Sequence, residues 1–269
     1  MNPKRLLSLT RVGIMESLHF RLGVFIMLFA NLIYLVLVYY LWKAIYASSG
    51  TDVVNGMTFS DTMIYLILAT ALFNFLEMFV MWNMSWSVQS GKIVLDLLKP
   101  MRYRKYTFWS YSGSYVVQFV LTFIPTFIIV MIVTKGAISL GINLLWFVIA
   151  TVLALLINYN IEMLVAPICL FTESIWGINI VKETIVLLLS GASIPLAFFP
   201  EKARMIVQYL PFRAVYDIPL SMLLGKSGTD TWQGLVSLFG LQLIWLVVLT
   251  VAGNLFWNCA VKKVTVNGG

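Results

Sequence analysis

Residues 22–42 read LGVFIMLFANLIYLVLVYYLW, a run of 21 residues without a charged side chain. An α-helix rises 1.5 Å per residue, so roughly 20 apolar residues cross the ~30 Å hydrocarbon core of a bilayer. The run ends in Tyr39, Tyr40 and Trp42, and aromatic residues are typical of a membrane–water interface. The run therefore predicts a transmembrane helix, and it is too long for the apolar region of a cleavable signal peptide.

The composition of the whole chain is that of a membrane protein. Of its 269 residues, 61% are hydrophobic and 11% are charged, and the mean hydropathy is +0.92. A soluble domain has about 25% charged residues. We therefore predict one all-α polytopic transmembrane domain over residues 1–269. The net charge of +7 fits cytoplasmic loops, and no basic–aromatic pattern indicates nucleic acid, so membrane lipids are expected as partners and nucleic acid is not.

Apolar stretches predict six transmembrane segments. The fifth contains Gly191, Pro195 and Pro200, so it is short and broken, and we expect it to re-enter the membrane rather than cross it as one helix. Pro125 predicts a kink in the third segment. The six segments lie at about 22–45, 62–83, 113–134, 142–171, 178–200 and 232–258.

The distribution of basic residues predicts the orientation. With both termini inside, the cytoplasmic segments carry twelve Lys and Arg residues and the outer segments carry six. Both termini are therefore expected in the cytoplasm. Four basic residues between segments five and six leave a five-span topology open. Residues 4–21 mix leucine and basic residues, and they fit either an interfacial helix or a basic leader.

The longest stretch between apolar segments, residues 84–111, has a more specific pattern. Its core, residues 88–100, reads VQSGKIVLDLLKP. Ile93, Val94, Leu97 and Leu98 have helical spacing, and Pro100 ends the pattern. We predict a short helix over 88–99 that either docks into a groove of a soluble partner or lies against lipid, and the pattern alone leaves both open.

Motifs for catalysis and metal binding are missing from the sequence. There is no phosphate-binding loop, and there is no H-E-x-x-H, C-x-x-C or G-x-S-x-G motif. Cys169 and Cys259 are expected to be free thiols, and His19 an interfacial residue. The chain is therefore not expected to be an enzyme or to hydrolyse ATP.

Three segments resemble permeases of type-2 ATP-binding-cassette exporters, most closely the compact bacterial permeases of the daunorubicin-resistance-like kind. Residues 89–100 are similar to the element that follows the second span in that family. Residues 190–200, SGASIPLAFFP, are similar to its fifth segment, and residues 209–212, YLPF, to the following element. The order and spacing of these segments extend over most of the chain.

The resemblance implies six helices, an amino-terminal interfacial helix, and a coupling helix between spans two and three that docks on a separate ATPase. It implies ATP and Mg on that partner, a second permease subunit with a heterodimer favoured, and the bacterial cytoplasmic membrane as location. Glu162 and Glu173 would form a second ATPase contact, and Gly191 and Pro195 would lie in the pathway. The expected ATPase-coupling residues are Gln89, Gly91, Lys92, Ile93, Leu95, Leu98 and Pro100.

Glu77 is the acidic residue inside the predicted second span. A carboxylate at membrane depth is costly, so it indicates either a gating or pathway residue or a structural partner of Arg102, Lys105 or Asn74. An alternative function, a proton-coupled carrier, would use Glu77, Glu162 and Glu173, but no internal repeat supports it. A membrane enzyme has no supporting motif. The aromatic and methionine residues of the spans suit an apolar or amphiphilic substrate and suit lipid contact equally well.

Overall fold

The computed structural model describes residues 3–19, 21–135, 138, 141–172, 175–226 and 228–262. It is helical apart from one short antiparallel hairpin, and the predicted all-α polytopic class is confirmed. Five helical stretches among the described residues are long and apolar enough to cross a bilayer: Leu28–Ser49, Phe59–Gln89, Tyr103–Val133, Ile142–Leu170 and Trp232–Val261.

The elements follow one another along the chain with short connections. They are α1 (Pro3–His19), α2 (Arg21–Ser49), β1 (Val53–Val54), β2 (Met57–Thr58), α3 (Phe59–Leu76), α4 (Val80–Gln89), α5 (Ile93–Leu97), α6 (Tyr103–Gln118), the π-helical turn η1 (Phe119–Phe123), α7 (Ile124–Val133), α8 (Ile142–Val165), the 3₁₀ turn η2 (Ala166–Leu170), α9 (Trp176–Leu189), the 3₁₀ turn η3 (Leu196–Phe198), α10 (Glu201–Val207), α11 (Asp217–Leu223) and α12 (Trp232–Val261).

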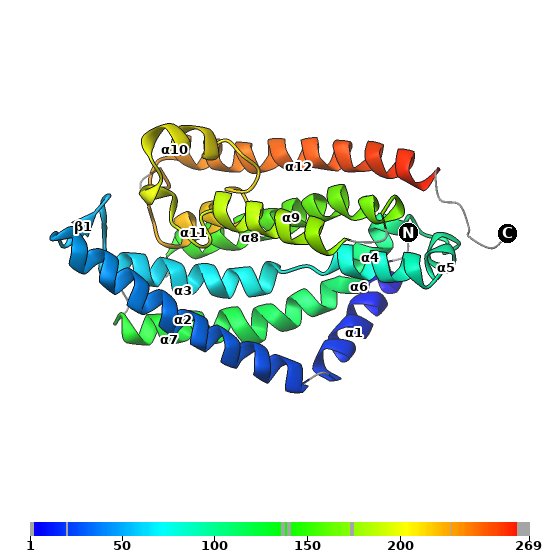
Figure 1. Ribbon diagram of the computed structural model, residues 1–269, viewed down its shortest axis with the longest axis horizontal. Coiled ribbons are helices and arrows are strands. Elements are labelled where there is room, and N and C mark those ends of the chain that lie inside the picture. Colours follow the sequence, from blue (N-terminus) through cyan, green and yellow to red (C-terminus); the bar gives the residue numbers. More distant parts are fainter. Residues whose placement is uncertain are drawn as a thin grey trace.

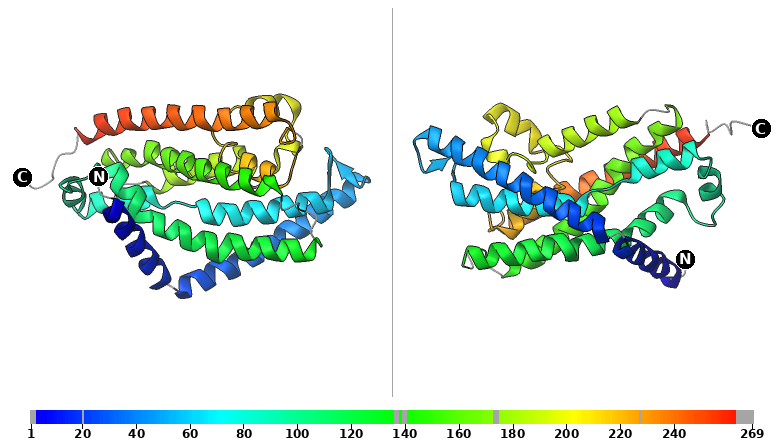
Figure 2. Two further views of the ribbon diagram at one scale, coloured as in Figure 1. Left: turned by 180° about the vertical axis from the view of Figure 1, so that it is seen from behind. Right: turned by 60° about the horizontal axis from the view of Figure 1, so that its bottom comes forward.

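The long helices run roughly along one axis, and the two ends of the molecule differ (Figure 1). The β1–β2 hairpin and α10 lie at one end. The start of α1, the end of α12, α4 and α5 lie at the other end. Helix α3 is the most buried of the long helices, whereas α2 packs obliquely on the outside (Figure 2). We call the end with α4 and α5 the terminal end and the opposite end the hairpin end.

Helix α1 is docked on α6 by close backbone contact. A Cβ atom on Gly113 would lie 2.2 Å from the Thr10 carbonyl oxygen, and one on Gly13 would lie 2.6 Å from the Ser110 carbonyl oxygen. Only small residues allow two helices to approach in this way. The hydroxyl groups of Thr10 and Ser112 share a hydrogen bond of 2.7 Å across the crossing. The described part of this segment, residues 4–19, is therefore packed on α6 and is not merely a basic leader.

Two of the long helical stretches are interrupted. Between α3 and α4, Glu77 has an extended backbone, with φ −60° and ψ 127°, although the sequence predicted a continuous span over 62–83. In the third stretch, the π-helical turn η1 directly precedes Pro125. Proline lacks an N–H group and its ring clashes with the carbonyl four residues earlier, which explains the wider turn at the predicted kink.

The predicted fifth segment, about 178–200, is helical only in its first part. Helix α9 has 14 residues and so covers about 21 Å, less than the ~30 Å of a hydrocarbon core. It ends at Leu189 with Ser190 as its C-cap, and Gly191 follows with φ +83°, a left-handed conformation that glycine adopts without strain. The chain then continues through η3 and α10 at the hairpin end.

Candidate functional site

The first candidate site is the short helix α5 at the terminal end. The helix predicted over 88–99 is divided: Gln89 ends α4, Gly91 has φ +72°, and α5 covers only Ile93–Leu97. A left-handed residue cannot continue an α-helix, which is why the sequence spacing overestimated its length. Pro100 is exposed in the turn that follows.

The side chains of α5 separate into an anchor and an exposed face. Ile93 is 4% exposed and belongs to the core, whereas Leu95 is 65% and Leu98 76% exposed. Lys92 is also exposed. Leu95 in α5 and Leu98 directly after it are therefore exposed at the end where α4 and α5 lie (Figure 1), whereas Ile93, which was also expected to couple, is buried in the core.

Lys99 gives this end a fixed positive charge. Its Nζ atom lies 2.7 Å from Asp96 Oδ1 and 3.7 Å from the centre of the Tyr106 ring. Burial acts to lower the pKa of Lys99, but the contacts with Asp96 and Tyr106 outweigh it, so the pKa is raised. The side chain thus stays charged at neutral pH beside the exposed leucines.

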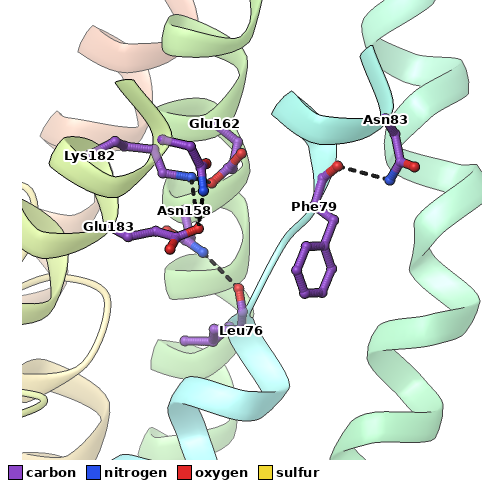
Figure 3. A network of polar contacts seen from close by, with 8 residues as sticks. Leu76, Phe79, Asn83, Asn158, Glu162, Lys182 and Glu183 are labelled. Carbon is purple, nitrogen blue, oxygen red and sulfur yellow. Dashed lines mark hydrogen bonds and ion pairs between the residues drawn. The ribbon is translucent and has the colours of Figure 1, made fainter. Parts of the chain in front are cut away.

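The second candidate site is the interruption between α3 and α4. The Leu76 carbonyl oxygen, freed where α3 ends, accepts a hydrogen bond of 2.7 Å from Asn158 Nδ2 of α8 (Figure 3). At the start of α4, Asn83 Nδ2 donates to the Phe79 carbonyl oxygen at 2.8 Å. Backbone groups at membrane depth need partners inside the protein, and these amides supply them. These side-chain hydrogen bonds therefore stabilise the interruption between α3 and α4.

A buried ion pair lies beside this interruption. Lys182 of α9 donates to Glu162 Oε1 of α8, and their side chains are 8% and 5% exposed. Glu183 lies 4.0 Å from Lys182 and accepts a hydrogen bond of 2.6 Å from Asn179. Figure 3 shows the charged side chains of α9 pointing toward α8. A charge buried in this way requires its partner, so the pair joins α8 to α9.

Glu77 belongs to the same network. Together with Glu162, Lys182 and Glu183 it lines a cavity of about 30 Å³, the size of a single water site. Its electrostatic neighbours are Glu183, Lys182 and Glu162. The structure therefore places Glu77 on the same cavity as Lys182 of α9, a residue that the sequence analysis did not consider as its partner.

The expected second ATPase contact needs correction at Glu162. This residue is 4% exposed and its carboxylate binds Lys182, so it is not available to a soluble partner. The sequence could not reveal this, because Lys182 lies 20 residues away and only the packing of α9 on α8 brings the two together. Glu173 lies outside the described residues.

A third cluster holds the hairpin end together. Asp217 accepts hydrogen bonds from Tyr65 at 3.2 Å and from Arg213 at 2.9 Å. Lys226 lies 3.9 Å from the centre of the Tyr65 ring; burial lowers the pKa of Lys226, and the nearby Asp217 carboxylate opposes that shift. Gly191 fits against this cluster, since a Cβ atom there would lie 3.0 Å from the Tyr65 hydroxyl.

Pro195 lies four residues after Gly191 in the segment that follows α9. Its carbonyl oxygen accepts a hydrogen bond of 2.9 Å from the Phe198 N–H group and so begins the turn η3. Gly191 and Pro195 thus shape the chain reversal after α9, although nothing in their geometry marks them as contacts of a substrate.

Comparison with known families agrees with this architecture. Residues 32–268 match the family described as ABC-2 family transporter protein. The chain belongs to this ABC-2 family. A comparison with curated proteins found no match.

Membership in the ABC-2 family has direct consequences. The chain is a membrane permease of an ABC exporter, and a permease of this family implies a partner ATP-binding-cassette ATPase. Family members are normally non-catalytic membrane components.

Among the described residues, no group of three or more His, Cys, Asp or Glu residues could hold a metal ion. Cys169 and Cys259 are free, as predicted.

Sequence reasoning missed one structural role in this ABC-2 permease. Arg104, counted among the loop residues, binds Asn254 Oδ1 at 2.5 Å and Asn160 Oδ1 at 2.6 Å. It packs against Gly253, where a Cβ atom would lie 3.1 Å from the guanidinium group. Arg104 therefore joins α6 to α8 and α12, and the only sequence signal was the asparagine near the end of each apolar stretch.

Proposed function

We propose that this ABC-2 permease couples to its ATPase through α5. The observation that supports the proposal is the exposure of Leu95 and Leu98 on a helix that Ile93 anchors to the core. An exposed apolar helix face flanked by charge suits a groove on a soluble partner. In this proposal Gln89, Gly91, Lys92 and Pro100 shape or border the contact, and ATP and Mg are bound by the partner.

The proposed working unit contains two permease subunits, with a heterodimer favoured, and two ATPases in the bacterial cytoplasmic membrane. Both termini and α5 would lie on the cytoplasmic side. Movement of α5 on nucleotide binding would be transmitted through α4 to the interruption at Glu77. The substrate pathway between the spans would then open alternately to the two sides of the membrane. The reversal at Gly191 and Pro195 would form a re-entrant hairpin on the outer side of the pathway. Coupling requires that the ATPase binds the two states differently.

The test is co-purification with the partner ATP-binding-cassette ATPase and measurement of its ATP hydrolysis. We expect Leu95→Asp and Leu98→Asp to reduce both by about tenfold or more, because each places a charge in an apolar contact, whose loss is worth at least ~1.4 kcal/mol. Leu98→Met is the control, since it keeps an apolar side chain of similar volume. Unchanged assembly and hydrolysis in both Asp variants would contradict the proposed contact.

The ABC-2 assignment favours this function over a proton-coupled carrier. The two differ in a measurable way. An exporter permease requires its ATPase and ATP, whereas a carrier would transport in vesicles that contain neither.

A further inference from the structure

Two cavities meet where α2 passes α3. The larger, about 620 Å³, lies between α2, α3 and α7, and the smaller, about 340 Å³, lies between α2, α3 and the end of α9. Both volumes fall in the range of small-molecule sites. The residues that line both cavities are Asn31, Thr70 and Asn74.

The oblique position of α2 creates this space (Figures 1 and 2). At the hairpin end α2 is held tightly: the Trp42 and Phe198 ring centres are 4.6 Å apart, and Tyr46 binds Thr62 through a hydrogen bond of 2.7 Å. Nearer its start α2 is loosely packed, and Leu32 is 60% exposed. The larger cavity extends from Ser60, in the first turn of α3, to Asn74 in its last, about 21 Å along the helix.

The shared wall of the two cavities carries an unused hydrogen-bond donor. The Nδ2 atom of Asn31 is buried and has no hydrogen-bond partner. Asn74 is 6% exposed, and it lines both cavities beside Asn31. Thr70, in contrast, donates to the Leu66 carbonyl oxygen at 2.9 Å. An unpaired amide donor at membrane depth is costly, so Asn31 Nδ2 calls for a ligand that pairs with it, and the neighbouring Asn74 amide can contact the same ligand.

The remaining wall restricts the class of ligand. Its other side chains are mostly aliphatic, and no residue of either lining is charged in the described part of the chain. A charged headgroup would therefore lose its hydration without gaining a counter-charge. An uncharged group with a carbonyl or hydroxyl can accept from Asn31 Nδ2, and apolar chains can fill the spaces on both sides.

We propose that Asn31 and Asn74 form the polar centre of a binding site for an uncharged amphiphile of the diacylglycerol class. Its ester carbonyls and hydroxyl pair with the two amides, and its acyl chains occupy the two cavities. The proposal deepens the exporter function, on which it rests, by naming the class of substrate. The site itself can be tested without ATP or ATPase.

The experiment uses the purified full-length permease in phosphatidylcholine nanodiscs and a diacylglycerol probe with a photoreactive diazirine in one acyl chain. Mass spectrometry identifies the labelled peptides. We expect labels on α2 and α3 that unlabelled diacylglycerol removes by competition and phosphatidic acid with the same chains does not. Asn31→Leu and Asn74→Leu should each reduce labelling about tenfold, the effect of one lost buried hydrogen bond.

Two further variants separate binding from folding. Asn258→Leu replaces an exposed asparagine of α12 outside both cavities and should label like the parent. Thr126→Phe fills the larger cavity from α7 without touching either amide and should also abolish the label. Size-exclusion profiles and melting temperatures close to those of the parent identify the variants that are folded.

Labelling that is equal in all variants, or that phosphatidic acid removes equally well, would overturn the proposal. So would a high yield of disulfide between two Asn31→Cys copies in a background with Cys169 and Cys259 replaced by alanine, because a second permease would then cover Asn31. If labelling depends on the two amides but the protein shows no ATP-driven transport, only the proposed exporter function is contradicted. If transport is driven by ATP but labelling is unchanged when either amide is replaced, only the proposed binding site is contradicted.

Discussion

Lys182, the single lysine of α9, is expected to contribute strongly to the stability of the fold. It neutralises Glu162 inside the protein, where neither side chain is more than 8% exposed. We expect Lys182→Met to lower the free energy of unfolding by about 3–5 kcal/mol, because it leaves a buried carboxylate without its partner. The double variant Glu162→Gln and Lys182→Met should recover most of this loss.

Thermal unfolding of the purified permease, followed by circular dichroism, compares these variants. Additive losses in the double variant would show that the two side chains are not coupled. Glu183→Gln is the matched control, since Glu183 is 43% exposed and lies 4.0 Å from the lysine, so its loss should change stability by less than about 1 kcal/mol.

Two glycines with the same backbone conformation make a second comparison. Gly91 and Gly191 have φ values of +72° and +83°. A Cβ atom on Gly91 would meet nothing within 4 Å, whereas one on Gly191 would lie 3.3 Å from Leu196 Cγ. Gly91→Ala should therefore cost only the left-handed strain of about 1–2 kcal/mol, and Gly191→Ala should cost more.

Melting temperatures of the two alanine variants check this order, and equal losses would contradict it. Gly91→Asn should be milder than Gly91→Ala, because asparagine tolerates the left-handed region. If Gly91→Ala also reduces stimulation of the ATPase while the protein remains folded, the turn at Gly91 sets the direction in which α5 points.

At the scale of elements, the crossing of α1 and α6 depends on a small residue from each helix. Gly113→Val should detach α1, because the new side chain would overlap the α1 backbone at 2.2 Å. Gly240→Val is the matched control, since a Cβ atom there meets nothing within 4 Å.

A disulfide reports the docked state of α1. The hydroxyl groups of Thr10 and Ser112 are 2.7 Å apart, so Thr10→Cys and Ser112→Cys should form a disulfide under mild oxidation once both native cysteines are replaced. The disulfide should form in the Gly240→Val background and be largely lost with Gly113→Val. Equal yields in both would show that α1 docks without the close approach.

The elements also show where sequence periodicity was sufficient. Long uncharged runs predicted α2, α8 and α12, since hydropathy over about 20 residues is a local property. The interruption at Glu77 was not predicted, because the α8 residue Asn158, which completes it, is 82 positions away from Leu76. The length of α5 was overestimated because the spacing of its leucines carried no signal for the left-handed turn at Gly91.

For the whole molecule, the orientation in the membrane can be measured directly. Helices α4 and α5 lie at one end, and the β1–β2 hairpin and the start of α12 lie at the other. With both termini in the cytoplasm, Asp52→Cys and Asp230→Cys should react with a membrane-impermeant maleimide in intact cells. Ser90→Cys should react only in inside-out vesicles. All three positions are exposed.

The native cysteines are replaced first, and cells made permeable with detergent supply the reference for full reaction. Labelling of Ser90→Cys in intact cells would reverse the orientation. Labelling of Asp52→Cys from outside together with Asp230→Cys from inside would favour the five-span topology that the basic residues after segment five left open.

The membrane class, the helical runs and the family resemblance followed from local sequence, because hydropathy, helical spacing and short motifs are properties of neighbouring residues. The site required tertiary structure. Glu162 with Lys182, Arg104 with Asn160 and Asn254, and Asn31 with Asn74 are each brought together by helix packing. In the sequence these side chains are polar residues in or beside apolar runs, and whether each is paired, buried or left unpaired depends on the helix that packs against it.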